Sequence, residues 1–311
     1  MSTLVCLGLG YCARHYVAEF GSRYARVAGT TRSRAKATDH PIEMLVFDGV
    51  NPTLELRSAI AAADRLLISA APGEAGDPVL AALANDFVVA RQLKSIVYLS
   101  SLGVYGDHGG AWIDETTPTL PAHNRGTARV DAELAWQALG KRRDIPVAIL
   151  RLAGIYGAGQ NAFIRLLAGR AHRIDIGEQS DAVLRTTMPG HVFNRIHVVD
   201  IAQAIDAAFA RDFDGIVNVA DDEPAPPGDP IVFAANLLGV EPPPALSLAE
   251  AQRTLSPMIL SFYQGCARVR NDKLKQVLGV TLRYPTYREG LQAVFDDGFE
   301  ASDPLASIES S

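Results

Sequence analysis

The first thirteen residues combine a strand of buried type with a glycine turn at its end. Residues 4–7 form a short apolar run, and Gly8-Leu9-Gly10-Tyr11-Cys12-Ala13 follows it directly. A helix-compatible stretch over residues 14–20 comes next, so the glycines lie at a predicted strand-to-helix turn. Gly8 permits the tight turn, Gly10 permits close approach of a ligand, and a diphosphate accepts hydrogen bonds from amides at a helix start. The pattern predicts a dinucleotide site; its alternative is an ordinary structural turn.

Apolar runs of strand type recur along the chain with helical segments between them. The further strands are expected at residues 25–29, 43–47, 65–70, 95–100 and 147–152, and the helices at 53–62, 78–92 and 126–139. Continuous apolar strands that alternate with helices are typical of a parallel sheet covered on both faces. The sequence therefore predicts an α/β protein with a doubly wound, Rossmann-type parallel sheet and a smaller C-terminal α/β lobe.

The regular alternation ends after Tyr156 and resumes near residue 196. Residues 196–200 are expected to lead from a strand into a helix, residues 216–219 form one more buried strand, and proline clusters follow at 224–230 and 242–244. We therefore predict a dinucleotide-binding domain from residues 1–156 with 196–221, and a substrate lobe from 157–195 with 222–300. Residues 301–311 are expected to be a flexible tail.

Charge and composition limit the classes of partner. The 311-residue chain has a net charge of −6 and no basic run, which argues against nucleic acid. No stretch approaches the ~18 apolar residues of a membrane span, and no cationic leader precedes the first apolar run. The three cysteines show neither metal-ligand spacing nor a disulfide framework. We predict a cytoplasmic protein without a metal, whose partner is a small-molecule substrate rather than nucleic acid or membrane.

The end of the second strand indicates which dinucleotide binds. The strand ends Gly29-Thr30-Thr31-Arg32-Ser33-Arg34, and the next acid is Asp39, so the acid that usually accepts the ribose hydroxyls is missing. Two arginines beside hydroxyl groups suit a 2′-phosphate, which predicts NADP, with NAD as the weaker possibility. The alternative is a solvated arginine pair. Ser69-Ala70-Ala71-Pro72 follows the fourth strand at the same edge of the sheet and is expected to line the cofactor.

Three further segments occur in a fixed order: Ser100-Ser101-Leu102-Gly103-Val104-Tyr105-Gly106, Arg151-Leu152-Ala153-Gly154-Ile155-Tyr156-Gly157 and Ile196-His197-Val198-Val199-Asp200. Together they resemble the landmarks of the extended short-chain dehydrogenase/reductases, in an atypical branch described as NAD(P)-dependent epimerase/dehydratase-like. The resemblance spans nearly the whole chain. It implies that Ser100 lies beside the cofactor and that Ser101 occupies the catalytic Ser/Thr position, which hydrogen-bonds the reacting oxygen; the alternative for Ser101 is a strand-end hydroxyl bonded to backbone.

The same resemblance reveals departures. The family spaces its glycines Gly-x-x-Gly-x-x-Gly, whereas Leu7 and Ala13 stand at the outer positions here. The family also has a tyrosine, a lysine four residues later and often a glutamate four further on. Counting back from Glu133 places Arg129 at the lysine position and Arg125 at the tyrosine position. Arg129 can still hold a ribose. Arg125 is a poor general acid but can clamp a carboxylate or phosphate; the alternative is a surface ladder of salt bridges.

The general acid must then be sought elsewhere in the site. His123 directly precedes the expected helix start at Asn124, where the helix N-terminus disfavours imidazolium and keeps the ring neutral near pH 7. Tyr105 lies four residues after Ser101, although in the family this tyrosine is mostly structural. His197 is more often a packing residue. The predicted catalytic group is Ser101, Tyr105, His123, Arg125 and Arg129.

These observations predict an NADP-dependent oxidoreductase or epimerase/dehydratase-like enzyme. Its substrate is small, and the arginines favour an anion. Two alternatives stay open: a catalytically inactive NADP(H)-binding sensor, which the two arginines favour, and a partner-binding scaffold. Family members often dimerise through the helices expected at 78–92 and 126–139, so the chain is predicted to be a monomer or a homodimer.

Overall fold

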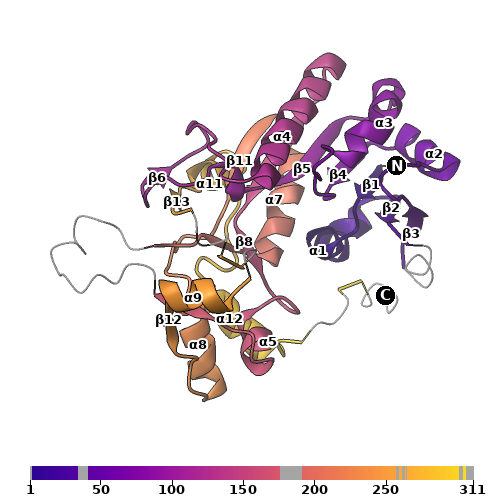
Figure 1. The fold of residues 1–311 in the computed structure, drawn as a ribbon. Helices are drawn as coiled ribbons and strands as arrows, with labels where there is room; N and C mark the ends of the chain where they lie inside the picture. Colours follow the sequence, from indigo (N-terminus) through magenta and orange to yellow (C-terminus); the bar gives the residue numbers. More distant parts are fainter. Residues whose placement is uncertain are drawn as a thin grey trace.

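A seven-stranded parallel sheet forms the centre of the molecule (Figure 1). The computed structural model describes residues 2–33, 41–175, 191–256, 259–260, 263, 265–300 and 304–305. The strand order is β11-β7-β5-β4-β1-β2-β3, and every pairing within the sheet is parallel. This order confirms the predicted doubly wound α/β fold. The strands are β1 (Thr3–Leu7), β2 (Arg26–Thr31), β3 (Glu43–Val46), β4 (Arg65–Ile68), β5 (Ser95–Ser101), β7 (Val147–Leu152) and β11 (Gly215–Val219).

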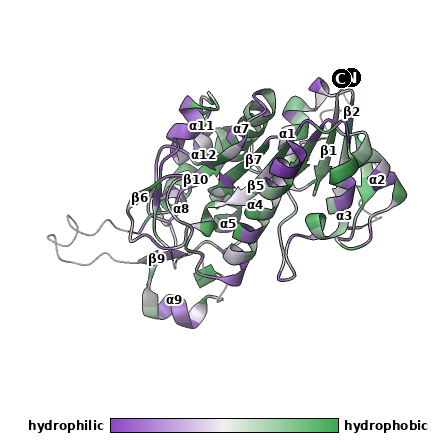
Figure 2. Ribbon diagram, turned by 90° about the horizontal axis from the view of Figure 1, so that it is seen from above, coloured by the Kyte–Doolittle hydropathy of each residue, from purple (hydrophilic) through white to green (hydrophobic). Residues whose placement is uncertain are grey.

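Helices cover both faces of the sheet. The helices α1 (Tyr11–Phe20) and α7 (Val198–Ala210) pack on one face, and α2 (Leu54–Ala61), α3 (Pro78–Val89) and α4 (Asn124–Arg143) pack on the other. Successive side chains of β1 enter different clusters: Leu4 and Cys6 join α1 and α7, whereas Val5 and Leu7 join α2, α3 and α4. The central strands are accordingly hydrophobic along their length (Figure 2).

Local side-chain caps fix where two of these helices begin. Thr53 accepts a hydrogen bond from Leu56 N (3.2 Å) at the start of α2. Asp77 starts α3, where its Oδ1 accepts from the amides of Val79 and Leu80. The other Asp77 oxygen accepts from Trp136 Nε1 of α4 at 2.8 Å. A single buried carboxylate therefore sets the start of one helix and ties it to the next.

Shorter elements surround the carboxyl edge of the sheet. Three two-stranded parallel pairs form there: β6 (Trp112–Ile113) with β13 (Arg268–Val269), β8 (Gly154–Tyr156) with β10 (Arg195–His197), and β9 (Arg173–Asp175) with β12 (Ala245–Ser247). The helices α5, α8 and α12 pack together around Phe163 and Tyr287. The helix bounds are α5 (Ala162–Leu167), α8 (Asp229–Leu238), α9 (Leu248–Thr254), α11 (Asp272–Gln276) and α12 (Tyr287–Asp296), with single 3₁₀ turns at Gly21–Arg23 and Leu102–Val104.

Two parts of the C-terminal region pack differently from expectation. Leu274, Leu278, Val280 and Leu282 join the α1/α7 core of the sheet rather than the group around α5 and α8. Of the expected tail, Pro304 and Leu305 belong to the described residues, and Leu305 is fully buried in the same core. The chain therefore returns to the sheet near its end. No helix among the described residues is both long and apolar enough to span a membrane.

Candidate cofactor and substrate site

The strand order reverses between β1 and β4, and in open α/β sheets the ligand-binding crevice lies outside the carboxyl ends of the strands at such a point. From β1 the chain continues to β2 and β3 on one side, whereas β4 is followed by β5, β7 and β11 on the other. The amides of Ser69 and Ala70 donate to the carbonyl of Leu7 at 2.9 and 3.0 Å. The loops that follow β1 and β4 therefore meet at the point where dinucleotides bind in such sheets.

The two glycines of the first turn have different roles. Gly8 has a φ of 93°, and a Cβ added there would lie 2.7 Å from the backbone nitrogen of Ala70. Gly10 has an ordinary φ of −88°, and an added Cβ would meet only Ser69 Oγ, at 4.0 Å. The fold itself requires Gly8. Nothing among the described residues requires Gly10, which leaves open space at the start of α1.

The first turn of α1 fits an anion. Gly10 is the N-cap residue of α1, no side chain caps the start of this helix, and no acidic residue lies in its first turn. The amides of Tyr11 and Cys12 therefore lie at the positive end of the helix without a side-chain cap. Burial raises the pKa of the Cys12 thiol to about 12, so the side chain stays neutral beside a phosphate. This cradle suits the diphosphate of a dinucleotide.

The end of β2 places positive charge beside the crevice. Arg32 is exposed and makes no ion pair with the described residues, while Thr31 and Ser33 are half-buried. Asp48 follows β3, but its carboxylate accepts from the amides of Val50 (2.8 Å) and Asn51 (2.7 Å). Arg34 lies outside the described residues. The described donors suit a 2′-phosphate.

The helix face with Arg125, Arg129 and Glu133 runs from solvent into the core. Glu133 is buried and pairs with Arg151 of β7, with 2.6 Å between Oε2 and Nη2. Arg129 donates from Nη1 to the carbonyl of Leu99 at 3.0 Å. Arg125 is exposed and has no hydrogen bond or ion pair with the described residues. The alternative of a surface salt-bridge ladder is wrong, because each of the three side chains has a different environment.

Two predicted residues lie in a buried polar network under the site. Ser100 donates from Oγ to Glu133. Tyr105 is 1% exposed and donates to Asn218 Oδ1 at 2.9 Å, with the Arg151 guanidinium 4.7 Å above its ring. Burial raises the pKa of Tyr105. This corrects the assignment of Tyr105 as a catalytic candidate, because its hydroxyl faces the core and not a substrate.

The remaining proton-transfer candidates differ in access. Ser101 is half-buried, and its Oγ accepts from Gly103 N at 3.2 Å, so its own hydrogen stays available to a ligand. His123 is exposed at the N-cap of α4, where the sequence placed it. His197 is buried, and burial lowers its pKa to about 3, which keeps it neutral. Ser101, His123, Arg125 and Arg129 thus remain candidates on the β5–α4 side of the crevice.

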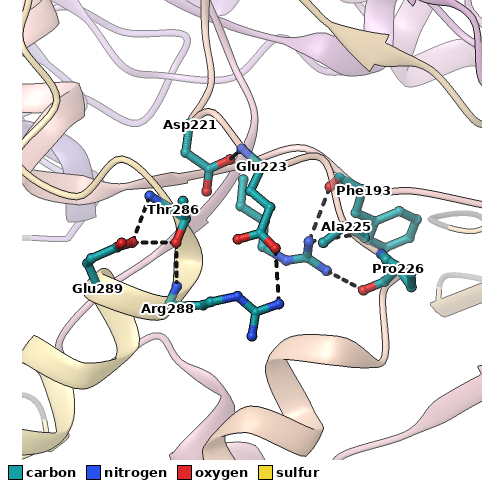
Figure 3. A network of polar contacts seen from close by, with 9 residues as sticks. Phe193, Asp221, Glu223, Ala225, Pro226, Thr286, Arg288 and Glu289 are labelled. Carbon is teal, nitrogen blue, oxygen red and sulfur yellow. Dashed lines mark hydrogen bonds and ion pairs between the residues drawn. The ribbon is translucent and has the colours of Figure 1, made fainter.

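Sequence reasoning missed a charged network between β10 and α12 (Figure 3). Arg195 donates to the carbonyls of Phe193 (3.1 Å), Ala225 (3.2 Å) and Pro226 (3.2 Å). Asp221 is 2% exposed, and burial raises its pKa to about 8, although the nearby Arg195 opposes this. The signal in the sequence was an acid two residues after the strand at 216–219, and its role becomes visible only when β10 lies beside it.

A small cavity borders this network and not the predicted site. Its volume is about 140 Å³, and it is lined by Trp112, Asp221, Asp222, Pro224, Val269, Arg270, Asn271 and Asp272. None of the predicted site residues lines it. In the described part of the chain, no three His, Cys, Asp or Glu side chains gather in an arrangement that could hold a metal ion.

Replacing Asp221 with asparagine should flatten part of the pH dependence of stability. The ordinary pKa of 3.8 is raised to about 8 in the folded protein, so the folded state binds the proton more tightly than the unfolded state. Wild-type stability relative to the variant should be greatest below about pH 4 and should fall by up to ~1.4 kcal/mol per pH unit as the pH rises towards 8. Urea unfolding of both proteins at several pH values measures this difference. A difference that stays constant with pH would contradict a protonated Asp221.

Comparison with known proteins gives this fold a family context. The profile of the NAD dependent epimerase/dehydratase family matches residues 8–220. The protein YeeZ of Escherichia coli (strain K12) is 30% identical over 263 residues, which cover 78% of this chain and 86% of YeeZ. The solved structure of a functionally unknown conserved protein from Silicibacter pomeroyi DSS is 43% identical, has a TM-score of 0.83, and covers 96% of this chain and 100% of its own.

A reductase is also similar to part of the chain. It is the 3-diazoavenalumate denitrifying reductase of a Streptomyces species, 29% identical over 171 residues. The match covers 53% of this chain and 52% of the reductase, so it spans about half of that protein. The doubly wound sheet, the glycine turn at its switch point and the profile match over residues 8–220 together show that this chain belongs to the NAD dependent epimerase/dehydratase family.

Proposed function

We propose that the chain is an NADP(H)-dependent oxidoreductase that acts on a small anionic molecule. The observation that supports it most is the crevice between β1 and β4. There an uncapped helix start with open space at Gly10 lies beside an exposed Arg32, at a strand end that has no acid. The family is named for NAD, and the choice of NADP rests on Arg32 and its neighbours.

Each part of the crevice has a proposed role in holding the cofactor. The amides of Tyr11 and Cys12 bind the diphosphate, and Arg32 with Thr31 and Ser33 binds the 2′-phosphate, with Arg34 proposed to assist. The loop Ser69-Ala70-Ala71-Pro72 borders the cofactor, since its first two residues lie against the end of β1. When bound, the nicotinamide supplies or accepts the hydride.

The substrate is proposed to lie between α4 and the group formed by α5, α8 and α12. Ser101 donates to the reacting oxygen, and Arg129 holds the nicotinamide ribose through the guanidinium donors that Leu99 leaves free. Arg125 clamps a carboxylate or phosphate of the substrate through its guanidinium donors. His123, exposed at the start of the same helix, exchanges the proton. The partly matching reductase is named for 3-diazoavenalumate, the anion of an acid, which is consistent with an anionic substrate for this chain.

Compartment and assembly are also proposals. Cys6 and Cys12 are buried, and no disulfide joins them, which suits a reducing cytoplasm. A monomer and a homodimer both remain compatible with the described surface.

NADPH should raise the melting temperature of the protein more than NADH does. A ligand that binds only the folded state stabilises it by about 2.7 kcal/mol at roughly a hundred times its Kd. Replacing Arg32 with alanine should weaken NADPH roughly ten- to hundredfold and leave NADH unchanged, because one charge-assisted bond to the phosphate is lost. Thermal shifts and calorimetric titrations measure both effects. Arg26→Ala, which removes an exposed arginine at the other end of β2, is the control.

Three outcomes have distinct meanings. No shift with either nucleotide would exclude a dinucleotide-binding protein. Equal losses of NADPH and NADH affinity in Arg32→Ala would show that this arginine does not read the phosphate. A larger shift with NADH in the wild type would replace NADP by NAD.

A catalytically inactive sensor is the second candidate function. It is favoured by the arginines at positions 125 and 129, which replace the family's tyrosine and lysine, and by the burial of Tyr105, whose hydroxyl is bonded to Asn218. NADPH oxidation over a panel of carbonyl compounds with and without carboxylates separates the two. Turnover that falls in Ser101→Ala and Arg125→Ala supports the enzyme, whereas NADPH binding without turnover of any compound supports the sensor.

A further inference from the structure

Tyr11 connects the cofactor crevice to the loop that enters the proposed substrate lobe. Its backbone amide lies in the first turn of α1, and its hydroxyl donates to the carbonyl of Ala158 at 2.8 Å. Ala158 follows β8 and precedes α5, and 147 residues separate the two partners in sequence. One residue therefore faces the proposed diphosphate with its backbone and the second lobe with its side chain.

The loop over residues 157–161 is a junction between three parts of the molecule. Asn161 is 3% exposed, and its Nδ2 donates to the carbonyls of Gly157 and Phe299, both at 2.9 Å. Its Oδ1 accepts from Ile164 N at 3.1 Å and so caps α5. Gly157 and Gln160 exchange two backbone hydrogen bonds, and Gly159 N donates to Phe299 O. Displacement of this loop would move both the start of α5 and the segment after α12.

Contact between Tyr11 and the loop is close. A Cβ added to Gly157 would lie 2.7 Å from Tyr11 Oη and 2.7 Å from a methyl carbon of Val198, and the φ of Gly157 is 155°. Burial, with a smaller contribution from Cys12, raises the pKa of Tyr11, so its hydroxyl remains a donor throughout the physiological range. The hydroxyl of Tyr11 therefore stays protonated and can donate to Ala158 at any physiological pH. The close packing at Gly157 leaves the hydroxyl little room to turn towards another acceptor.

We propose that Tyr11 is a positioning residue that couples cofactor binding to the order of the loop over residues 157–161. The inference rests on the proposed function, because it requires a dinucleotide on the first turn of α1. A diphosphate held by the amides of that turn restricts the backbone of Tyr11, and with it the direction of the side chain that holds Ala158. Cofactor binding therefore stabilises the entrance to the substrate lobe before any substrate arrives.

Thermodynamic linkage sets how much the contact between Tyr11 and the loop can change NADPH affinity. If the cofactor strengthens the contact of Tyr11 with the loop, the contact strengthens cofactor binding by the same factor. A single neutral hydrogen bond sets the limit, so removal of the hydroxyl should weaken NADPH by about three- to tenfold. Removal should also abolish the protection that NADPH gives to the amides of the loop.

Hydrogen exchange with and without NADPH tests this directly. In the wild type, the amides of Gly157, Gly159 and Gln160 should exchange several-fold more slowly when NADPH is bound. In Tyr11→Phe, which keeps the ring, these amides should exchange at the same rate with and without NADPH. Tyr24→Phe is the matched control. This variant removes a hydroxyl beyond the other end of α1 that is hydrogen-bonded to the hydroxyl of Tyr16 at 2.6 Å. NADPH should still slow the exchange of the loop amides in this variant.

Calorimetry on the same samples separates failure of this inference from failure of the proposed function. No NADPH binding by the wild type would overturn both. Normal binding, with loop protection that is absent in the wild type or unchanged in Tyr11→Phe, would overturn the inference alone. Gly157→Ala is a second variant, because its methyl group displaces the loop from Tyr11 without touching the crevice. It should reproduce the lost protection, and NADPH-dependent protection of its loop equal to that of the wild type would contradict the coupling.

Discussion

Replacing Glu133 with alanine should lower the free energy of unfolding by about 3–5 kcal/mol. The Glu133 and Arg151 side chains are 3% and 5% exposed, so the substitution leaves a guanidinium buried without its counter-ion. Ser100 loses its acceptor as well, and the arginine above the Tyr105 ring loses the group that orients it. Urea unfolding at neutral pH, followed by circular dichroism, measures the loss.

An exposed ion pair provides the control for this experiment. Arg26 and Glu43 are paired at 2.7 Å, but their side chains are 42% and 40% exposed. Glu43→Ala should therefore cost less than about 1 kcal/mol. If the two alanine variants lose similar stability, the Glu133–Arg151 pair is not buried as described here.

Alanine at Gly8 should mainly lower the stability of the protein, whereas alanine at Gly10 should mainly lower its affinity for NADPH. Gly8→Ala should destabilise the protein by at least about 2 kcal/mol, because it forces a Cβ into a positive-φ position. The clash is with the backbone nitrogen of Ala70, only 2.7 Å away, which no side-chain rotation relieves. Gly10→Ala should change stability by less than about 1 kcal/mol, because its Cβ enters open space. We propose that the diphosphate approaches through that space, so NADPH affinity should fall at least about tenfold.

Unfolding curves and NADPH titrations of the two variants give both results. The wild-type protein and Gly73→Ala, at a glycine whose added Cβ would meet nothing within 4 Å, are the references. Unchanged NADPH affinity in Gly10→Ala would mean that the cofactor does not approach the start of α1. A stable Gly8→Ala protein would mean that the loop after β4 can move away.

The sheet could be predicted from sequence because its strands are local signals. Apolar runs bounded by polar or glycine residues gave the seven strands, and the sixth was placed at residues 147–152, where β7 lies. Helix starts were less accurate. Residues 14–20 were expected to be helical, whereas α1 begins at Tyr11, because an uncapped start after Gly10 leaves no side-chain signal.

The chemistry of buried side chains could not be predicted, because it depends on distant partners. In the sequence, Tyr105 has the position of a catalytic candidate. In the structure its hydroxyl donates a hydrogen bond to Asn218, which is 113 residues away. Glu133 served only as a reference point for counting along the helix, yet the side chain that pairs with it belongs to β7. Asp221 and Arg195 likewise become neighbours only when the segment after β11 lies against β10, where Asp221 N donates to the carbonyl of Arg195 at 2.7 Å. Spacing along one helix or strand does not contain this information.

One turn of helix α4 is anchored in the core, and another turn is exposed to solvent. Glu133 binds it to the sheet at its third turn, whereas His123 and Arg125 at its first turn contact solvent. Substitutions at those exposed positions should therefore leave the folded scaffold intact. If the substrate binds there as proposed, the same substitutions should alter which molecules are accepted. Selection for new chemistry in this lineage can act on that end of the helix with little penalty in foldability.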